Sequence, residues 1–289
     1  MQLDFQKMHG LGNDFAVFDC RNRSFEFTSD QIKCLSDRNL GIGFDQMLVI
    51  ENPPNDNVDF LYRIFNADGG EVEHCGNGAR CFAKYLRDKG IFNFQRPVRV
   101  AIKKGYIEID YVGKDANGED IFRVDMGQVD FSPFTHKQSS ALEERIDCGV
   151  FGIFSFGILS IGNPHAVCVV EDIKTAPVKE IGSFLQNHPL FPEKVNVGFM
   201  QLCGRDRIKL RVFERGCGET KACGTGACAA TAVGIGRGIL DRCVTVELAG
   251  GNVMVEWNGT EFAKITMNGR ASTVYSGKID ESSLQTTSK

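Results

Sequence analysis

Two cysteines lie in matched glycine-rich loops, one in each half of this 289-residue chain. Shifting the sequence by 148 positions (223 − 75) places Cys75 on Cys223 and gives 8 identities between residues 62–81 and 210–229. In both copies a strand-like run comes before the loop, and residues at helical spacing follow it. We interpret the copies as one duplicated unit: a strand, a turn that carries a thiol, and a helix.

A thiol at the start of a helix has particular chemical properties. The first amide groups of a helix lack partners within it and the helix dipole is positive there, so a thiolate or a carboxylate is stabilised. In such surroundings the pKa of a thiol can fall from about 8.5 to roughly 3.5–7.5, which makes a thiolate available as a base. The glycine after each cysteine, Gly76 or Gly224, lets a ligand approach the backbone closely.

Two such thiols, one from each half, suit the inversion of a stereocentre. One thiolate removes the proton from one face of a Cα carbon, and the opposite thiol gives a proton to the other face. The two helix N-termini would stabilise the charge that develops on the neighbouring carboxylate. No lysine lies in an evident cofactor motif, so the sequence gives no sign of pyridoxal phosphate.

The remaining pattern predicts the elements that position these loops. Helical spacing and end signals predict helices over residues 28–39, from Cys75 to Gly90, over 177–187 and over 224–237. Residues 7–15 have the composition of a turn or a loop between apolar runs. Short runs broken by glycine, as in residues 98–126, favour hairpins. We expect an α+β fold of two pseudo-symmetric domains, each a mostly antiparallel sheet or barrel wrapped around a central helix.

The duplication also predicts the domain boundaries. We expect an N-terminal domain over residues 1–124, which carries Cys75 and is completed by the C-terminal segment 270–289. The C-terminal domain, with Cys223, would then cover residues 125–269. A chain of 289 residues with 42% hydrophobic content can supply a core for each.

Composition narrows the possible partners and the compartment. A net charge of −4 and a pI near 5.8 leave no basic excess, so we expect neither a nucleic acid nor a membrane as partner. No apolar run approaches about 18 residues, and the N-terminus lacks the features of a signal peptide. The sequence therefore predicts a cytoplasmic protein.

The cysteines are expected to be reduced thiols, since their number, 11, is odd and no export signal is evident. No Cys-x-x-Cys pair occurs, so we expect no metal. Core positions are predicted for the cysteines outside the two loops: Cys20, Cys34, Cys81, Cys148, Cys168, Cys203, Cys228 and Cys243.

Seven motifs between residues 7 and 228 closely resemble diaminopimelate epimerases. They are Lys7–Phe15, Gly43–Gln46, Phe65–Gly69, Cys75–Cys81, Gly162–His165, Glu214–Gly216 and Ala222–Ala227. The resemblance implies a cofactor-independent, two-cysteine enzyme that interconverts LL- and meso-2,6-diaminopimelate in lysine biosynthesis. It also implies two domains that close over this small-molecule substrate, and a homodimer.

Site residues follow from the resemblance, motif by motif. Cys75 and Cys223 would be the acid and base, and the backbone amides of Gly76, Asn77, Gly224 and Thr225 would bind the reacting carboxylate. The distal carboxylate would be held by Asn66, Asn163, Asn196 and Arg215, and the distal ammonium by Glu214. Asn13 and Gln46 would line the same pocket. His165 and Glu214 would tune the thiol pKa values, and Tyr275 would contact a second subunit.

Several alternatives remain open at this stage. Cys217 departs from the family pattern and is expected to be a small core side chain rather than a second thiol near the pocket. Glu71 and Glu219 are as suited to capping nearby backbone as to touching a substrate. A proline-racemase-like enzyme or another isomerase of the same fold would use the same two thiols.

Two alternatives belong to other classes of protein. A structural metal site could use His74, Cys75, Cys81, Cys223 and Cys228. A phosphate-binding module could also place glycine-rich loops at helix N-termini, but neither loop has the Lys-Ser/Thr of a P-loop or the Gly-x-Gly-x-x-Gly spacing.

Overall fold

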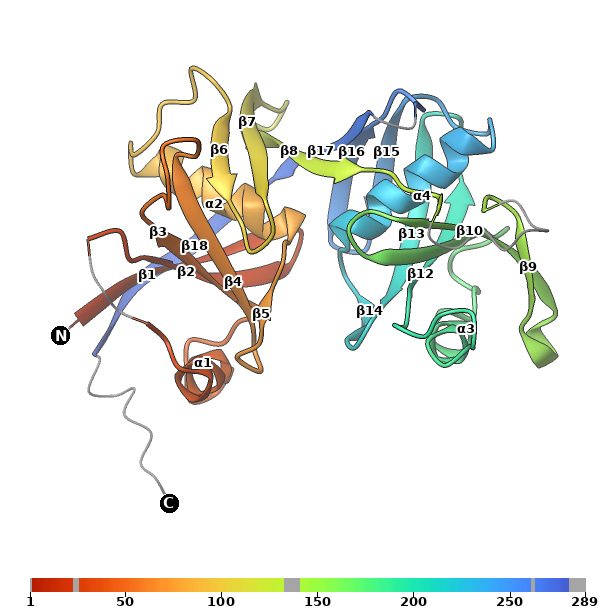
Figure 1. Ribbon diagram of the computed structural model, residues 1–289, viewed down its shortest axis with the longest axis horizontal. Helices are drawn as coiled ribbons and strands as arrows, with labels where there is room; N and C mark the ends of the chain where they lie inside the picture. The colour runs from red at the N-terminus through yellow and green to blue at the C-terminus, as the bar shows by residue number, and fades with distance from the viewer. Residues whose placement is uncertain (1, 23–25, 133–140, 261–262, 281–289) are drawn as a thin grey trace. The chain divides into compact units, whose positions relative to one another are not determined.

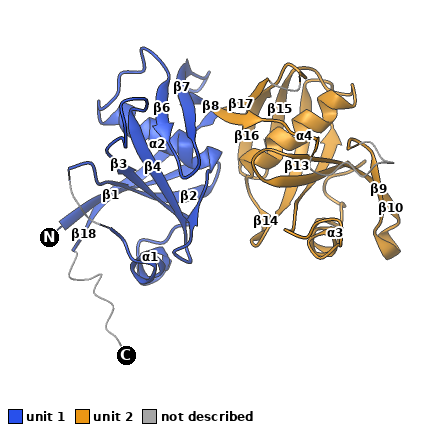
Figure 2. Cartoon of the chain, viewed as in Figure 1, with its two compact units in different colours: residues 1–124, 269–289 blue, residues 125–268 orange. Residues whose placement is uncertain are grey.

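The computed structural model describes residues 2–22, 26–132, 141–260 and 263–280. The chain forms two compact units, coloured blue and orange in Figure 2. Unit 1 contains residues 1–124 and 269–289, and unit 2 contains residues 125–268. The chain leaves unit 1 within strand β8 (Asp120–Gln128) and returns within strand β17 (Lys264–Arg270). Among the described residues, no helix is long and apolar enough to cross a membrane.

Unit 1 is a mixed sheet around one helix. Antiparallel pairs join β1 to β2, β3 to β4, β4 to β5, and β6 to β7 to β8, while β2 runs parallel to β3 and β4 parallel to β6. A last strand, β18 (Ser272–Asp280), pairs antiparallel with β1. The other strands are β1 (Gln2–Gly10), β2 (Asn13–Asp19), β3 (Gln46–Glu51), β4 (Phe60–Asn66), β5 (Glu71–Val72), β6 (Val98–Ala101) and β7 (Tyr106–Lys114).

Unit 2 repeats this topology pair for pair. Its order runs β10–β11 antiparallel, β11–β12 parallel, β12–β13 and β13–β14 antiparallel, β13–β15 parallel, then β15–β16–β17 antiparallel. A hairpin strand, β9 (Glu144–Asp147), pairs with β10 beside the short helix η2 (Gly149–Phe151). The other strands are β10 (Ile153–Ser160), β11 (Pro164–Val169), β12 (Asn196–Leu202), β13 (Arg207–Glu214), β14 (Gly218–Thr220), β15 (Cys243–Leu248) and β16 (Gly251–Glu256).

The predicted α+β fold of two similarly built halves is confirmed. Sequence alone did not reveal the two parallel pairings in each unit. They arise because a helix connects the paired strands, as parallel pairing requires a long crossover. One crossover in each unit is α2 (Gly76–Asp88) or α4 (Gly224–Gly236), and the other is α1 (Ser29–Ser36) or α3 (Val178–Leu185).

Helices α2 and α4 are the buried helices of their units (Figure 1). Each has 13 residues, begins directly after its cysteine and ends before a glycine with positive φ, Gly90 or Gly238. Helix α4 packs closely on its neighbours, since a Cβ added to its Gly234 would clash with Leu240 Cδ1, and one added to Gly157 of β10 would lie 2.5 Å from Val233 Cγ1 in α4. The predicted central helices are therefore present.

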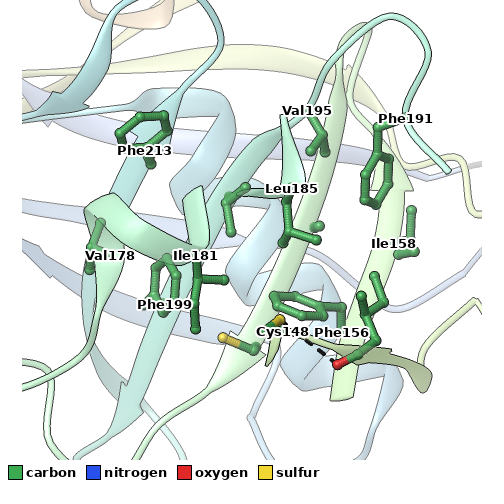
Figure 3. Close-up of a cluster of buried hydrophobic side chains, with 14 of the residues drawn as sticks. Cys148, Phe156, Ile158, Val178, Ile181, Leu185, Phe191, Val195, Phe199 and Phe213 are labelled. Atoms are coloured by element: carbon green, nitrogen blue, oxygen red, sulfur yellow. Dashed lines mark hydrogen bonds between the residues drawn. The ribbon is translucent and has the colours of Figure 1, made fainter. Parts of the chain in front are cut away.

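The shorter helices cover the sheets from outside. A capping box between Thr28 and Gln31 starts α1, which ends at Ser36, three residues earlier than predicted, because the Asp37 carboxylate accepts the amides of Asn39 and Leu40 at 2.8 Å. In unit 2, α3 packs on β12 and β13 in the apolar cluster of Figure 3.

The turn or loop predicted over residues 7–15 is a β-hairpin with a short turn. Strand β1 continues to Gly10, β2 begins at Asn13, and the turn is only Leu11 and Gly12, with φ of 58° and 83°. Two consecutive residues with positive φ match the twist of a two-residue hairpin. Glycines and Asx residues indicated a turn correctly but not its length.

The predicted core positions hold for five of the eight other cysteines. Cys20, Cys81, Cys148, Cys168 and Cys228 are buried. Cys34, Cys203 and Cys243 are exposed, so the prediction is wrong for them. An apolar neighbour in the sequence does not fix which face of an element a side chain occupies.

Candidate functional site

Cys75 is the N-cap residue of α2 and lies in a small cluster of polar side chains in unit 1. Its Sγ donates to Oδ1 of Asn13 across 3.7 Å. The same oxygen accepts from Nδ2 of Asn77 at 3.3 Å. Asn13 stands directly after the hairpin turn, and Asn77 lies in the first turn of α2, 3% exposed. The hairpin therefore brings an amide oxygen to the thiol.

Gln46 and Asn66 form a second pair in the same unit. Gln46 begins β3, Asn66 ends β4, and the two residues face each other across the sheet. Nε2 of Gln46 donates to Oδ1 of Asn66 at 2.8 Å. Asp45, the residue before Gln46, accepts from Nδ2 of Asn13 at 3.1 Å. Predicted binding residues of unit 1 thus gather at the end of the sheet where α2 begins.

Cys223 is the N-cap residue of α4 and has a carboxylate beside it. Its thiol donates to Oε2 of Glu214 at 3.1 Å, and its Sγ accepts from the amide of Gly226 at 3.4 Å. Thr220 donates to the other oxygen of the same carboxylate. The Thr225 hydroxyl lies 3.7 Å from the sulfur. Glu214 is therefore placed to exchange a proton with Cys223.

Burial changes the acidity of this pair. It raises the pKa of the Cys223 thiol well above its ordinary value, and the negative charge of Glu214 raises this pKa further. Burial also raises the pKa of Glu214. A helix N-terminus can lower the pKa of a thiol, but at Cys223 burial and Glu214 raise it. The amide of Gly226 lowers this pKa, but burial outweighs it.

We call the polar side chains around Cys75 and around Cys223 the Cys75 and Cys223 half sites. In the Cys223 half site, His165 contacts Asn163. The imidazole is 1% exposed, and its Nε2 lies 3.0 Å from Oδ1 of Asn163. Asn163 in turn donates to the hydroxyl of Thr225 at 3.4 Å. Burial, with a smaller effect of Arg215, lowers the pKa of His165 to about 3, so the ring is neutral. His165 reaches the thiol's neighbours rather than the sulfur itself.

Asn196 and Arg215 form the remaining part of this half site. Asn196 begins β12, is 3% exposed and donates to the carbonyl of Pro164 at 3.1 Å. Its Oδ1 accepts the amide of Arg215 at 2.9 Å. The guanidinium of Arg215 is exposed and donates to the carbonyl of Glu193 at 3.2 Å. Asn196 thus fixes the backbone from which Arg215 projects.

The two half sites also correspond through a second offset, of 150 positions, that sequence comparison missed. We call the two offsets the frame of 148 and the frame of 150. Phe15 pairs with Gln46 as His165 pairs with Asn196. Three equivalent pairs lie 150 positions apart (163 − 13): Asn13 and Asn163, Phe15 and His165, Gln46 and Asn196. The frame changes from 150 to 148 because the connection between β3 and β4 is longer than that between β12 and β13.

Not all equivalent positions carry the same chemical groups. In the frame of 148, Asn66 stands where unit 2 has Glu214, and in the frame of 150, Phe15 stands where it has His165. The Cys223 half site therefore carries two ionisable groups that these positions lack in the Cys75 half site.

Glu71 and Glu219 have a structural partner that sequence reasoning did not identify. Glu71 forms an ion pair with Arg63 at 2.9 Å, and Glu219 forms the same pair with Arg211 at 2.6 Å. Each arginine precedes its glutamate by eight residues on the neighbouring strand. The repeated identities at these four positions are explained by a repeated ion pair.

Two further predicted positions lie at the surface. Cys217 is exposed in the turn between β13 and β14, so its predicted core position is wrong. Tyr275 in β18 is 46% exposed, and its ring makes an edge contact with Phe5 at a centroid distance of 6.0 Å.

Neither a metal-ligand group nor a cavity adds residues to the candidate site in the described part of the chain. Within the described ranges, no group of three or more His, Cys, Asp or Glu side chains is arranged to hold a metal. Unit 1 has a cavity of about 410 Å³ between β1, the end of α2 and β18, and none of the predicted site residues lines it.

Comparison with known proteins identifies the relatives of this chain. The family model for diaminopimelate epimerase matches residues 5–132 and 157–274. A diaminopimelate epimerase of Chromobacterium violaceum is 48% identical over 283 residues, which cover 97% of this chain and 100% of the relative. A diaminopimelate epimerase of Burkholderia vietnamiensis is 48% identical over 292 residues, which cover 97% of this chain and 99% of the relative.

Solved structures with the same fold are more distant in sequence. A hydroxyproline epimerase from Agrobacterium vitis has a TM-score of 0.71 at 15% identity, covering 96% of this chain and 92% of its own. A PhzF-family phenazine biosynthesis protein from Bacillus anthracis has a TM-score of 0.70 at 18% identity, covering 97% of this chain and 99% of its own. At these identities the likeness concerns the fold.

Proposed function

The chain belongs to the diaminopimelate epimerase family, and on that premise we propose that it interconverts LL-2,6-diaminopimelate and meso-2,6-diaminopimelate without a cofactor. This isomerase reaction is a step of lysine biosynthesis. The observation that supports it most is the repeated half site, in which a cysteine precedes a buried helix in the same frame of each unit. Duplicated thiols suit a reaction with two mirror-related steps.

Cys75 and Cys223 are the proposed acid and base. One thiolate takes the Cα proton, the electron pair moves into the neighbouring carboxylate, and the other thiol then protonates the opposite face. Glu214 accepts the proton of Cys223 in the 3.1 Å contact that joins them. Cys223 therefore has a proton acceptor of its own when it acts as the base.

Amide groups at the helix N-termini are the proposed site of the reacting carboxylate. The backbone of Gly76, Asn77, Gly224 and Thr225 lies in the first turns of α2 and α4, where amides lack partners within the helix. Negative charge grows on the carboxylate as the proton leaves, and preoriented amides stabilise it most at that moment.

The other end of the substrate carries a second carboxylate and ammonium. We assign the carboxylate to Asn66, Asn163, Asn196 and Arg215, whose guanidinium can bind it with two parallel hydrogen bonds. Asn13 and Gln46 line the same region, and Glu214 is the assigned partner of the ammonium. Since both Glu214 oxygens already accept hydrogen bonds, its contact with Cys223 favours tuning of the thiol as its main role. His165 acts on the same half site through Asn163.

The first test is a direct assay. Purified protein and LL-diaminopimelate without added cofactor should yield the meso isomer, resolved by chiral chromatography. L-Proline is the control substrate, because a proline-racemase-like enzyme would invert it. L-Lysine, which lacks the distal carboxylate, should react far more slowly than diaminopimelate. Absence of meso product, or efficient inversion of proline, would contradict the proposal.

We also propose a cytoplasmic homodimer. Tyr275 is 46% exposed on β18, where Val274 beside it is 57% exposed. Consecutive residues face opposite sides of a strand, so both faces of β18 present an apolar side chain that a second subunit could cover. Sedimentation of the wild type should give twice the mass of 31.9 kDa, and Tyr275→Ala should weaken association. A monomeric wild type at assay concentration would overturn this assignment.

A further inference from the structure

A directed chain of hydrogen bonds runs through the Cys75 half site. Arg80 donates from Nη2 to Oδ1 of Asn77 at 2.7 Å. Asn77 donates from Nδ2 to Oδ1 of Asn13 at 3.3 Å, and Asn13 donates from Nδ2 to Oδ2 of Asp45 at 3.1 Å. Two carboxamides thus link a guanidinium to a carboxylate, and the sulfur of Cys75 lies beside the central oxygen.

The chemistry of the two ends fixes the direction of this chain. A guanidinium only donates hydrogen bonds and an ionised carboxylate only accepts them. Asn77 must therefore present its oxygen to Arg80 and its NH₂ group to Asn13. Asn13 must present its NH₂ group to Asp45, which leaves its oxygen for Asn77 and for the thiol.

Both ends have further partners in unit 1; the Arg80 end is buried, whereas the side chain of Asp45 is 44% exposed. Arg80 is fully buried, and its Nε donates to the carbonyl of Arg270 at 3.0 Å, just after the chain returns to unit 1 in β17. Asp45 is held by Arg38 at 2.7 Å and accepts the amide of Asp14 at 3.1 Å. Gly10 allows the close approach, since an added Cβ would lie 3.3 Å from Nη2 of Arg80 and 3.1 Å from the carbonyl oxygen of Asn77.

Unit 2 lacks the charged residues at both ends of this series of hydrogen bonds. In the frame of 148, Cys228 is the equivalent of Arg80, and in the frame of 150, Val195 is the equivalent of Asp45. Both are fully buried apolar side chains. The directed chain therefore belongs to the Cys75 half site alone.

We propose that Arg80 and Asp45 are positioning residues that together hold the Asn13 carbonyl oxygen against the Cys75 thiol. An oxygen in that place accepts from the protonated thiol and opposes the thiolate. An inverted Asn13 would instead offer its NH₂ group, which favours the thiolate. The chain thus sets Cys75 to rest as a proton donor, while Cys223 has Glu214 as its proton acceptor. This inference rests on the proposed two-thiol reaction.

A double-mutant cycle tests the proposal, with alkylation of each cysteine by iodoacetamide followed by mass spectrometry from pH 6 to 10. Asp45→Asn removes an anion and Arg80→Gln removes a cation, so the single variants should shift Cys75 reactivity in opposite directions. In each single variant, the charged residue that remains still fixes the orientation of both carboxamides. Only the double variant lets both amides invert, so it should react about tenfold faster at pH 7 than the product of the single effects predicts.

Two control variants separate the effect of the hydrogen-bond direction from the effects of a lost charge and of altered folding. Asp45→Glu keeps an end that only accepts, and Asp30→Asn removes an exposed charge elsewhere in unit 1. In both, Cys75 should react as in the wild type. Cys223 is the internal reference and should keep its rate in every variant. Strictly additive effects on Cys75, or equal changes at both cysteines, would overturn the proposal.

A second measurement does not depend on a folded Arg80→Gln variant. In wild-type protein labelled with ¹⁵N, the side-chain amide of Asn13 should give one pair of NMR signals across the titration of Cys75, whereas a second population would overturn the proposal. Neither readout uses epimerase activity, so failure here is distinguishable from failure of the proposed function.

Discussion

The thiol of Cys223 donates a hydrogen bond to Oε2 of Glu214 at 3.1 Å. The charge of Glu214 adds to burial in raising the pKa of this thiol. Glu214→Gln keeps the shape and removes the charge, so the variant's Cys223 should form its thiolate at lower pH and react faster with iodoacetamide at pH 8. Cys75 in the same sample should be unaffected. Unchanged reactivity of Cys223 would show that the carboxylate does not govern it.

His165 predicts a pH dependence of stability. Its pKa falls to about 3 from an ordinary 6.5, so between these values the unfolded chain binds a proton that the folded chain does not. The free energy of unfolding therefore falls as pH falls from 6.5 towards 3. At about 1.4 kcal/mol per pH unit, the loss between pH 6.5 and 5 is about 2 kcal/mol.

The matched variant for this prediction is His165→Phe, since Phe15 occupies the equivalent position in unit 1. Urea unfolding at pH 7 and pH 5 gives both free energies. The difference between variant and wild type should move by about 2 kcal/mol in favour of the variant at the lower pH. Equal losses in both proteins would mean that His165 is not the titrating group.

Gly78 is needed for the first turn of α2 to fit against the sheet. A Cβ at this position would lie 2.5 Å from the Tyr62 hydroxyl and 3.2 Å from Leu48 Cδ2. In an exposed helix, alanine stabilises by about 1 kcal/mol relative to glycine. Here Gly78→Ala should instead destabilise by about 1–3 kcal/mol in urea unfolding. Gly204→Ala, at an exposed site near a flexible carboxylate, is the control and should be nearly neutral.

Glu71 should contribute little to either stability or catalysis. Its ion pair with Arg63 is partly exposed, at 25% and 30%, and such pairs are worth about 0–1 kcal/mol. Glu71→Gln should therefore unfold within about 1 kcal/mol of the wild type and keep its turnover rate. A large loss of turnover with unchanged stability would revive a direct role in substrate binding.

Much of the fold could be predicted from the sequence because the duplication repeats local patterns. Cys75 and Cys223 stand in matched glycine-rich loops, and the helices after them end just before Gly90 and Gly238, as their spacing indicates. Helix ends and turn types depend on nearby residues, so a single sequence carries them.

Other features depend on partners far away in the sequence. The pairing of Phe15 with Gln46, which reveals the second frame, requires knowledge of strand register. The resemblance implied that Glu214 tunes the thiol of Cys223, but the raised pKa could not be predicted, since its largest cause is burial in the folded unit. Arg80 in turn looks like an ordinary surface residue of a helix until its burial is known.

The central claim is that two different thiols serve the two faces of one carbon. Its most direct test is the first turnover of LL-diaminopimelate in deuterated water, analysed by mass spectrometry. If one thiol removes the proton and the other delivers a solvent-derived one, each meso product carries one deuterium at Cα from the start, and both Cys75→Ala and Cys223→Ala stop turnover. Early meso product that retains the original hydrogen would indicate a single base and contradict the account.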